Sequence, residues 1–342
     1  MKDYKNILII KMSSLGDVIH ALPTLYAIRK NWPQAKITWA VHEQFSAVLP
    51  GMPWIDEVIY IDKKKLKSFS YLRTLRRQLH DHQFDMCLDL QCLAKSAIVA
   101  FLSGAKEKYG YWELREGSKL VNKALVGPNQ YGHVIERYLD TVRVLGGTVD
   151  SIEFPMRRSS EAAATVGNKL KEYSIDLKAP YIVMAPGARW AVKEWPVEQF
   201  AALVDALTPM DLPIVLVGAA SDESKGKAIK ELATNPKLVD FIGHTSLLEL
   251  IELIGHSALY ISADTGPLHM ANALKVPLIA LFGPTAPDRT GPYGGDYVHI
   301  IKSPTSRATV EEPLIDDPQC MAQIPVQQVA DEARLILNKI KN

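Results

Sequence analysis

A polar turn lies at the centre of the stretch Leu259–Thr285. The apolar run Ala258–Ala263 has the length and composition of a buried strand, and Leu268–Leu274 has helical spacing with His269 in its first turn. The turn between them consists of Asp264, Thr265, Gly266 and Pro267. A helix that begins at the carboxyl end of a parallel strand points backbone N–H groups at that edge, where an anion such as a diphosphate is favoured. The turn therefore predicts a phosphate site, and the alternative is that Asp264 or Thr265 only caps the helix.

A second polar loop follows the first predicted strand. Asn6–Lys11 is short and apolar, and Val18–Asn31 has the apolar spacing of a helix. The loop between them carries Ser13, Ser14, Gly16 and Asp17. It contains no G-x-G-x-x-G fingerprint of dinucleotide-binding proteins. A carboxylate beside a helix N-terminus is stabilised in its charged form, so Asp17 is either a functional carboxylate or a helix cap.

Two sheets are needed to position these loops. The chain of 342 residues is long enough for two domains, and both halves alternate predicted strands with predicted helices. We expect an α/β fold of two Rossmann-like parallel-sheet domains that face a central cleft. The expected parts are an N-terminal Rossmann-like domain (1–165), a C-terminal Rossmann-like domain (166–325) and a C-terminal helix (326–342) that either stays with the second domain or packs back on the first.

Composition narrows the class of protein. With 47% hydrophobic and 23% charged residues the chain resembles an ordinary globular protein, and its net charge of +1 gives no case for binding nucleic acid. The cysteines Cys87, Cys92 and Cys320 form no C-x-x-C pair, which favours free thiols in a reducing compartment. The apolar run Ile7–Ile10 is too short for a signal peptide, and no run has the length of a membrane span. We therefore expect a protein of the cytoplasm or of a membrane face.

A basic segment dominates the first half. Lys63–Arg77 holds seven basic residues and no acidic one, and a helix there would place Leu66, Phe69, Leu72 and Leu75 on one side. Lys95, Arg115 and Arg137 continue the basic character, whereas the second half is expected to be neutral. The segment is either a solvated face or a surface for a phosphorylated or carboxylated acceptor or for anionic lipid head groups.

Three longer motifs resemble a known family. KMSSLGDVIHALP, PGARWAVKEWP and SADTGPLHMANALKVPLIALFGPTAP are similar to the signatures of the bacterial ADP-heptose glycosyltransferases, glycosyltransferase family nine. DLQCLAKSA and YGYWELREGS resemble its heptosyltransferase I branch. The resemblance implies a GT-B architecture and an inverting, metal-independent transfer of L-glycero-D-manno-heptose from ADP-heptose. The implied acceptor is a Kdo sugar of the lipopolysaccharide inner core, in Kdo2-lipid A. No cofactor is implied besides the donor substrate.

The same resemblance assigns roles to individual residues. Asp17 matches the catalytic base, which an inverting displacement needs on the acceptor side, and Lys193 matches the lysine that meets the departing diphosphate. The implied donor-binding residues are Ser14, Gly16, Gly187, Glu223, Asp264, Thr265, Gly266 and His269. Asp264 is expected to face heptose hydroxyls, and Asp222 is an alternative to Glu223 for the ribose. The implied acceptor-binding residues are Lys63, Lys64, Lys67, Lys95, Arg115 and Arg137.

Two departures and three alternatives remain open. Ala188–Ala191 lacks the threonine pair of close relatives, and Cys92 replaces a usual glycine. Heptosyltransferase II or another ADP-sugar transferase is one alternative, a UDP-sugar epimerase of the same fold is another, and a non-catalytic nucleotide-binding or lipid-binding module is the third. In the favoured interpretation the protein is cytoplasmic and touches the anionic inner face of the cytoplasmic membrane transiently.

Overall fold

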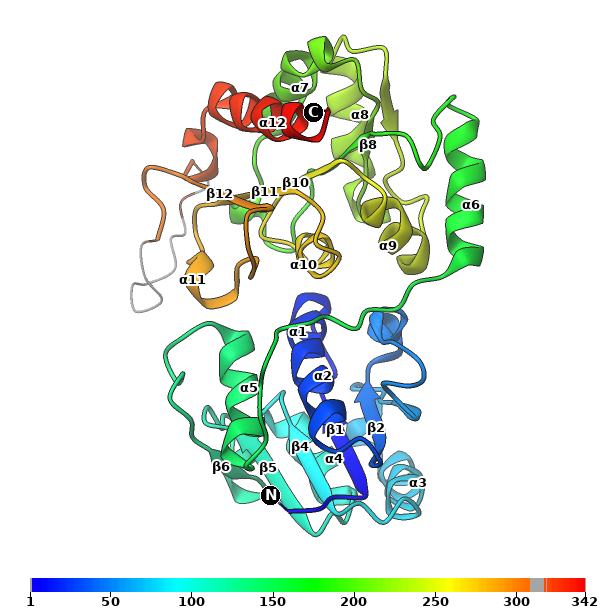
Figure 1. Cartoon of the computed structure of the whole chain (residues 1–342), viewed down its shortest axis with the longest axis vertical. Helices are drawn as coiled ribbons and strands as arrows, with labels where there is room; N and C mark the ends of the chain where they lie inside the picture. The colour runs from blue at the N-terminus through cyan, green and yellow to red at the C-terminus, as the bar shows by residue number, and fades with distance from the viewer. Residues whose placement is uncertain (1, 308–316, 318, 342) are drawn as a thin grey trace. The chain divides into compact units, whose positions relative to one another are not determined.

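The computed structural model describes residues 2–307, 317 and 319–341 (Figure 1). The chain divides into two compact units, Met1–Arg157 and Arg158–Asn342. This division lies slightly before the 165/166 boundary expected from the sequence, because the helix Ser160–Lys171 packs on a helix of the second unit. The first unit has 22 Lys and Arg against 16 Asp and Glu, a net charge of +6, and the second has 17 against 22, a net charge of −5. The expectation of a neutral second half is therefore wrong.

The first unit is built on a parallel sheet in the order β3-β2-β1-β4-β5-β6. Its strands are β1 (Asn6–Ile10), β2 (Lys36–Val41), β3 (Glu57–Tyr60), β4 (Met86–Asp89), β5 (Glu107–Tyr111) and β6 (Lys123–Leu125). Its helices are α1 (Leu15–His20), α2 (Leu22–Asn31), α3 (Phe69–His80), α4 (Ala94–Leu102) and α5 (Val134–Val144), with short 3₁₀ helices at Glu43–Val48, Lys65–Lys67 and Ser118–Leu120.

The second unit repeats this plan in the order β12-β11-β10-β7-β8-β9, again parallel. Its strands are β7 (Ile182–Ala185), β8 (Ile214–Leu216), β9 (Leu238–Asp240), β10 (Leu259–Ala263), β11 (Leu278–Phe282) and β12 (Val298–Lys302). Its helices are α6 (Ser160–Lys171), α7 (Val197–Ala206), α8 (Glu223–Leu232), α9 (Leu247–Gly255), α10 (Gly266–Ala273), α11 (Pro287–Thr290) and α12 (Val326–Lys341). Short 3₁₀ helices lie at Ala191–Lys193, Thr208–Met210, Ala220–Asp222 and Met321–Gln323.

The strand order reverses at the same place in both sheets. The first strand of each unit pairs with the fourth, β1 with β4 and β7 with β10. In open α/β sheets ligands bind at such a switch point, beyond the carboxyl ends of the two strands. The loops that leave these four strands are therefore where a site belongs.

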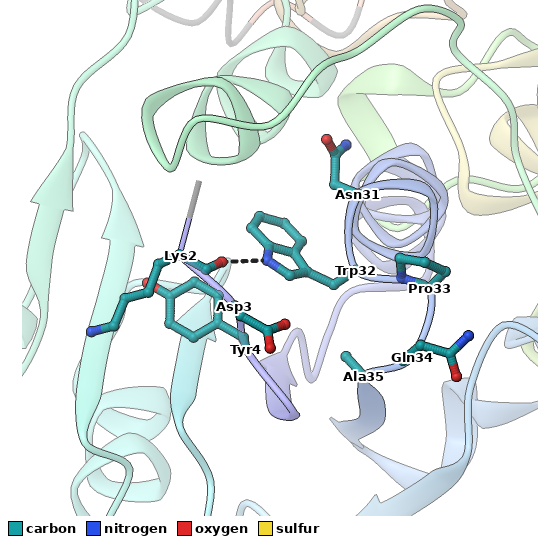
Figure 2. A pocket seen from close by; sticks show the side chains of 8 residues that line it. All are labelled: Lys2, Asp3, Tyr4, Asn31, Trp32, Pro33, Gln34 and Ala35. Atoms are coloured by element: carbon teal, nitrogen blue, oxygen red, sulfur yellow. Dashed lines mark hydrogen bonds between the residues drawn. The ribbon is translucent and has the colours of Figure 1, made fainter.

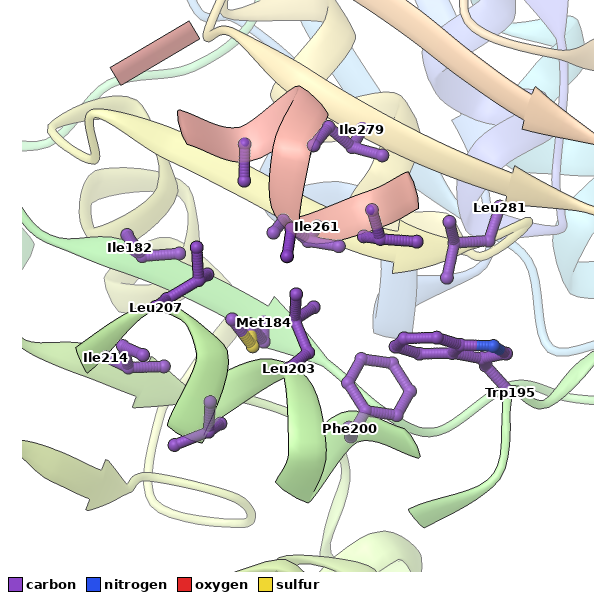
Figure 3. Close-up of a cluster of buried hydrophobic side chains, with 14 of the residues drawn as sticks. Ile182, Met184, Trp195, Phe200, Leu203, Leu207, Ile214, Ile261, Ile279 and Leu281 are labelled. Atoms are coloured by element: carbon purple, nitrogen blue, oxygen red, sulfur yellow. The ribbon is translucent and has the colours of Figure 1, made fainter. Parts of the chain in front are cut away.

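An apolar core holds the second sheet beneath its helices. Ile261 and Ile279 on the strands pack with Phe200 of α7 and with Trp195, whose ring lies 5.0 Å from that of Phe200 (Figure 3). Helix α12 packs on α7, β10 and β11 and buries Ala330, Ala333, Ile336 and Leu337 in the same cluster. Burial of an apolar side chain of this size contributes about 1.5–3 kcal/mol to folding stability. Because helices cover both faces of a parallel sheet, its strands gain this stability on both sides and are continuous apolar runs.

Three local expectations differ from the structure. The helix expected at 18–31 is two helices, because α2 restarts at Leu22 with Pro23 in its first turn. The apolar stripe expected in Lys63–Arg77 fails at Phe69, which is 82% exposed because α3 only begins there; Leu75 and Leu79 are the buried positions. Strands β5, β6 and β12 were not expected from the sequence.

Candidate active site

The turn after β10 brings four polar side chains of the second unit together. Asp264 is the centre: its Oδ2 accepts from Lys193 Nζ at 2.6 Å and from Thr285 Oγ1 at 3.0 Å, and its Oδ1 lies 3.6 Å from His269 Nε2. The Asp264 side chain is 10% exposed and that of Lys193 16%. Burial alone would raise the pKa of Asp264, but the hydrogen bond from His269 and the charge of Lys193 hold it below its ordinary range.

The same turn forms the N-terminus of α10. Thr265 is the N-cap, and its Oγ1 accepts from the backbone N–H of Leu268 at 3.4 Å. Pro267 follows within the first turn, where its fixed backbone angle and missing N–H suit a helix start. The helix cap left open in the sequence is thus present at Thr265, while Asp264 is tied to Lys193 and His269. The helix still presents its N-terminal dipole at the switch point.

Lys193 reaches this turn from the loop after β7. It ends the short 3₁₀ helix Ala191–Lys193, and its Nζ also lies 4.7 Å from the centre of the Trp190 ring. The loop is pinned at Glu194, whose Oε1 accepts from the backbone N–H of Ala188 at 3.1 Å. The 188–191 segment, which lacks the threonine pair of relatives, is therefore shaped by a neighbouring carboxylate.

Lys225 joins this loop to the one after β8. Its Nζ donates to Glu194 at 2.6 Å and to Asp222 at 2.8 Å. Burial lowers the pKa of Lys225, but the hydrogen bonds to Asp222 and Glu194 outweigh it and the net pKa is raised. Neither Glu194 nor Lys225 was singled out in the sequence, since no motif marks an ion pair between residues 31 positions apart.

The two acids considered for the ribose have different surroundings. Asp222 is held by Lys225 and by the backbone N–H of Ala219, and a Cβ at Gly187 would collide with its carboxylate. Glu223, the first residue of α8, is exposed, and within the described ranges no ion pair of its carboxylate is found. The geometry therefore favours Glu223 over Asp222 as the acid available to a ligand.

The loop after β1 carries the candidate base of the first unit. Asp17 Oδ2 accepts from the backbone N–H of Ser14 at 2.8 Å and from its Oγ at 2.7 Å, which forms a capping box at the start of α1. The side chain is partly exposed at the carboxyl edge of the sheet. Gly16 lies in the same first turn. One carboxylate oxygen thus has the capping role that the sequence left open.

The turn after β4 fixes this loop from the other side of the switch point. Gln91 Oε1 accepts from the backbone N–H groups of Met12 and Ser13, both at 3.1 Å. Gln91 is itself anchored, because its N–H donates to the buried Asp89 Oδ1 at 2.9 Å. Burial raises the pKa of Asp89 although several donors bind its carboxylate. Gln91 was missed in the sequence as a residue that holds the Asp17 loop.

Cys92 has a packing role in the same turn. Its Sγ donates to the carbonyl of Asp89 at 2.9 Å and would lie 2.6 Å from a Cβ at Gly110. Its φ of 52° is one that glycine adopts readily, which is consistent with the glycine that the family resemblance leads us to expect at this position. Burial raises the pKa of the thiol. The Cys92 thiol therefore fills space in the packed turn and is not a reactive nucleophile.

The six acceptor-binding candidates separate by exposure. Lys64, Lys67, Lys95 and Arg115 are exposed and Lys63 is partly so. Arg137 differs from expectation: it is 5% exposed, its Nε donates to the Gly132 carbonyl at 2.7 Å, and its guanidinium lies 5.9 Å from the Trp112 ring. Arg137 therefore supports the loop that precedes α5 in this structure, and its expected role at the acceptor stays a prediction.

A pocket of the first unit lies away from these loops. Its walls come from the chain before β1 and before β2, with Trp32 donating to the Lys2 carbonyl at 2.8 Å (Figure 2). It occupies the amino ends of the strands, opposite the switch-point edge, and is therefore not the candidate site.

Neither a metal cluster nor a membrane span is found in the parts described. No three His, Cys, Asp or Glu side chains gather there as metal ligands, and no helix there is long and apolar enough to cross a bilayer. The expectation of metal independence stays a prediction.

Comparison with known proteins identifies the family. Residues 72–315 match the profile of glycosyltransferase family 9 (heptosyltransferase). Lipopolysaccharide heptosyltransferase 1 of Pseudomonas aeruginosa is 27% identical, over 97% of this chain and 98% of the relative. The family 9 glycosyl transferase of Veillonella parvula superposes with a TM-score of 0.88 at 24% identity, covering 99% of both chains. The Escherichia coli heptosyltransferase WaaC with ADP superposes with a TM-score of 0.77 at 23% identity, covering 97% of this chain and 99% of the other.

These matches confirm the GT-B fold of two parallel-sheet units and the resemblance drawn from the three motifs. The UDP-GlcNAc 2-epimerase of Methanocaldococcus jannaschii also superposes, with a TM-score of 0.53 at 13% identity over 98% of this chain and 94% of the other, which shows a shared fold alone. The family profile covers well over half of the sequence, including the Lys193 loop, the Asp264 turn and α3 from residue 72 onward. The chain belongs to glycosyltransferase family 9, the heptosyltransferases.

Proposed function

We propose that this enzyme transfers a heptose from ADP-heptose to a Kdo sugar of the lipopolysaccharide inner core, in Kdo2-lipid A. The observation that carries the donor assignment is the cluster at the β7/β10 switch point. There the mostly buried cation of Lys193 lies beside the N-terminus of α10. An anionic diphosphate suits both groups. The E. coli heptosyltransferase described with ADP also supports the donor assignment. The acceptor assignment is supported by the name of the Pseudomonas relative, a lipopolysaccharide heptosyltransferase 1.

The proposed chemistry is a single inverting displacement. The acceptor hydroxyl oxygen forms a bond to the anomeric carbon of the heptose while the bond from that carbon to the diphosphate oxygen breaks. Asp17 takes the hydroxyl proton, and ADP leaves with the electron pair of the broken bond. Lys193 and the α10 N-terminus stabilise the negative charge that grows on ADP. These groups supply the charge stabilisation that a metal ion would otherwise provide, so no metal is required in this proposal.

The remaining contacts follow from exposure. Glu223 holds the ribose hydroxyls, while Gly187 and Gly266 let the backbone approach the donor. The exposed lysines of the first unit and Arg115 face the carboxylates and phosphates of the acceptor. The enzyme works in the cytoplasm, at the inner face of the cytoplasmic membrane where a lipid-anchored acceptor is available.

Turnover of ADP-heptose with acceptors of differing core length tests the donor and the acceptor together. Transfer to Kdo2-lipid A is expected, and transfer only to an acceptor that already carries a heptose would instead support a heptosyltransferase II. Asp17→Asn is expected to lower kcat by about 10²–10⁴-fold with unchanged ADP affinity, because the proton loses its acceptor. Asp150→Asn, an exposed carboxylate of the same unit, is the matched control. Unchanged turnover in Asp17→Asn would remove Asp17 as the base.

A further inference from the structure

Helix α4 is apolar on the side that faces solvent. Its inner residues Ala97, Val99 and Ala100 are buried, as expected for a helix on a sheet. Its outer side carries Ile98, which is 36% exposed, and Phe101, which is 69% exposed. A surface helix normally turns polar residues outward, and one that is apolar all round is normally covered. The outer side of α4 therefore has the composition of a covered surface.

Neighbouring elements extend this side of the first unit. Helix α3 packs beside α4, and the His80 ring lies 2.9 Å from where a Cβ of Gly104 would be, so the carboxyl ends of the two helices are adjacent. The 3₁₀ helix Ser118–Leu120 packs on α4 from its other end and holds Leu120 at 86% exposure. We call the outer surface of α3, α4 and Ser118–Leu120 the α3–α4 face.

The charge of this face is predominantly positive. Two exposed acids lie at its edges: Asp81 directly follows α3, and Glu116 Oε2 accepts from the backbone N–H of Ala94 at the start of α4. The three stretches of sequence that build it, 63–80, 90–106 and 117–135, contain no Asp or Glu. They contain eleven basic residues: Lys63, Lys64, Lys65, Lys67, Arg73, Arg76, Arg77, Lys95, Lys106, Lys119 and Lys123. On α3 the arginines at 73, 76 and 77 are all exposed. The unit that carries the face has the net charge of +6 noted above.

We propose that the α3–α4 face docks on the surface of an anionic lipid bilayer. Ile98, Phe101 and Leu120 enter the boundary between head groups and acyl chains, and the surrounding Arg and Lys side chains pair with lipid phosphates. Charge complementarity selects this occupant, because a symmetric dimer through the α3–α4 face would place one basic face against another. The proposal deepens the proposed function, since it explains how the enzyme meets a lipid-anchored acceptor, but docking does not depend on turnover.

Binding of the full chain to vesicles tests the proposal. Flotation with vesicles of phosphatidylcholine alone is compared with vesicles containing phosphatidylglycerol, at low and high salt. Strong binding is expected only with phosphatidylglycerol, and it should weaken as salt rises because surface charges are screened. Equal binding to both vesicles, or binding that salt does not change, would overturn the electrostatic part.

Two sets of variants separate the apolar and the basic contributions. Phe101→Ser with Leu120→Ser is expected to weaken binding by about tenfold or more, the effect of withdrawing partly inserted apolar side chains. Replacing the three arginines of α3 by glutamine is expected to weaken it by about 100-fold, at roughly fivefold for each charge near the surface. Leu232→Ser with Leu335→Ser, which removes exposed leucines of the second unit, is the matched control. We call the Phe101→Ser, Leu120→Ser double variant the apolar pair. If the apolar pair binds vesicles as strongly as the control variant, or if its substitutions change the oligomeric state instead, the α3–α4 face binds another partner and the proposal is wrong.

Activity assays keep this proposal separate from the proposed function. The apolar pair is expected to retain turnover on a soluble, deacylated acceptor and to lose it on the same acceptor embedded in vesicles. Loss of turnover on the soluble acceptor by the apolar pair would mean that the residues shape the enzyme rather than dock it. Vesicle binding by a wild-type chain that transfers no heptose would overturn the proposed function and leave docking intact.

Discussion

Replacing Lys193 by Met should destabilise the second unit most at neutral pH. The change keeps the length of the apolar stem and removes the charge that lies 2.6 Å from Asp264 Oδ2. Asp264 is then left ionised in a site where its side chain is only 10% exposed, with His269 and Thr285 as remaining neighbours. A buried carboxylate that loses its partner retains the full cost of its desolvation.

The size of the effect follows from burial. Breaking a fully buried pair from one side costs about 3–5 kcal/mol, and the 16% exposure of Lys193 places this pair near the lower end, at about 3 kcal/mol. For a unit of this size that corresponds to a fall in melting temperature of about 6–12 °C. Lys302→Met is the control, because its pair with Asp288 spans 3.8 Å between side chains 42% and 66% exposed. An exposed pair of that kind contributes at most about 1 kcal/mol.

The pH dependence has a definite sign. In the native chain the pKa of Asp264 is lowered, so its contribution to stability is present above the unfolded value of about 3.9 and is lost as pH falls through the folded value. Without Lys193 the Asp264 carboxyl group loses a charge and a hydrogen bond that lower its pKa, so it takes up a proton at a higher pH than in the native chain. The difference in the free energy of unfolding between the variant and the native chain should therefore shrink as pH is lowered from 7 toward 4.

Hydrogen exchange of peptides covering β7 and β10 measures this stability within the second unit, where a whole-chain melt would mix two units. Lys193→Met combined with Asp264→Asn should recover most of the loss, with a coupling of about 2 kcal/mol, because the unpaired charge is gone. A loss in Lys193→Met that is the same at pH 7 and pH 4, or that the second substitution does not relieve, would refute the account of Asp264 as a buried anion held by Lys193.

Three further substitutions test the loops at the switch points. Gln91→Ala should lower kcat by about tenfold with unchanged ADP affinity, because the loop before Asp17 loses two backbone hydrogen bonds. Gln91→Glu keeps an acceptor oxygen and should lower kcat less. Equal losses of kcat in the two variants would exclude a positioning role for Gln91. Gly187→Ala should lower donor affinity at least tenfold, because the new Cβ would collide with the Asp222 carboxylate. Gly295→Ala is the control and should leave donor affinity unchanged, because open space surrounds a Cβ at that position. Titration with ADP measures the affinity of both variants. Glu223→Gln should raise the KM for the donor about tenfold and leave the free energy of unfolding unchanged. Asp222→Asn should instead lower the free energy of unfolding, because Asp222 loses its ion pair with Lys225. A raised KM in Asp222→Asn and a lower stability in Glu223→Gln would exchange the roles of the two acids.

The sequence was sufficient for the sheets' main strands and for the loops that leave them. β1, β7, β10 and β11 are continuous apolar runs, and the polar residues after them fall at a carboxyl edge wherever parallel strands alternate with helices. Strands β5, β6 and β12 were not recognised in the sequence because they are partly exposed and carry charged residues, so only their pairing partners reveal them. Local periodicity carries no such information.

The supporting residues of the site could not be found from the sequence. Gln91 reaches backbone groups 78 and 79 positions away, and Lys225 joins two loops that belong to different strands. Their residue types have no spacing rule, because the contacts are created by strand order. The burial of Arg137 was not predicted for the same reason. A basic residue on a helix is expected to be exposed unless the side of the helix that packs on the sheet is known.

The surroundings of Asp264 explain how an aspartate is tolerated beside a proposed diphosphate site. The sequence suggested that it must face sugar hydroxyls, since a carboxylate near phosphate is otherwise repelled. In the structure its two oxygens already have separate partners: Oδ2 is bound by Lys193 and Thr285, and Oδ1 lies by His269. If Lys193 turns toward a diphosphate, Asp264 keeps the Thr285 hydroxyl and the His269 imidazole but loses its ion pair, so the contact between Lys193 and the diphosphate must offset that loss. Because the second unit has a net charge of −5, local groups such as Lys193 and the α10 N-terminus must supply the attraction for the donor, and Asp264 holds Lys193 in place.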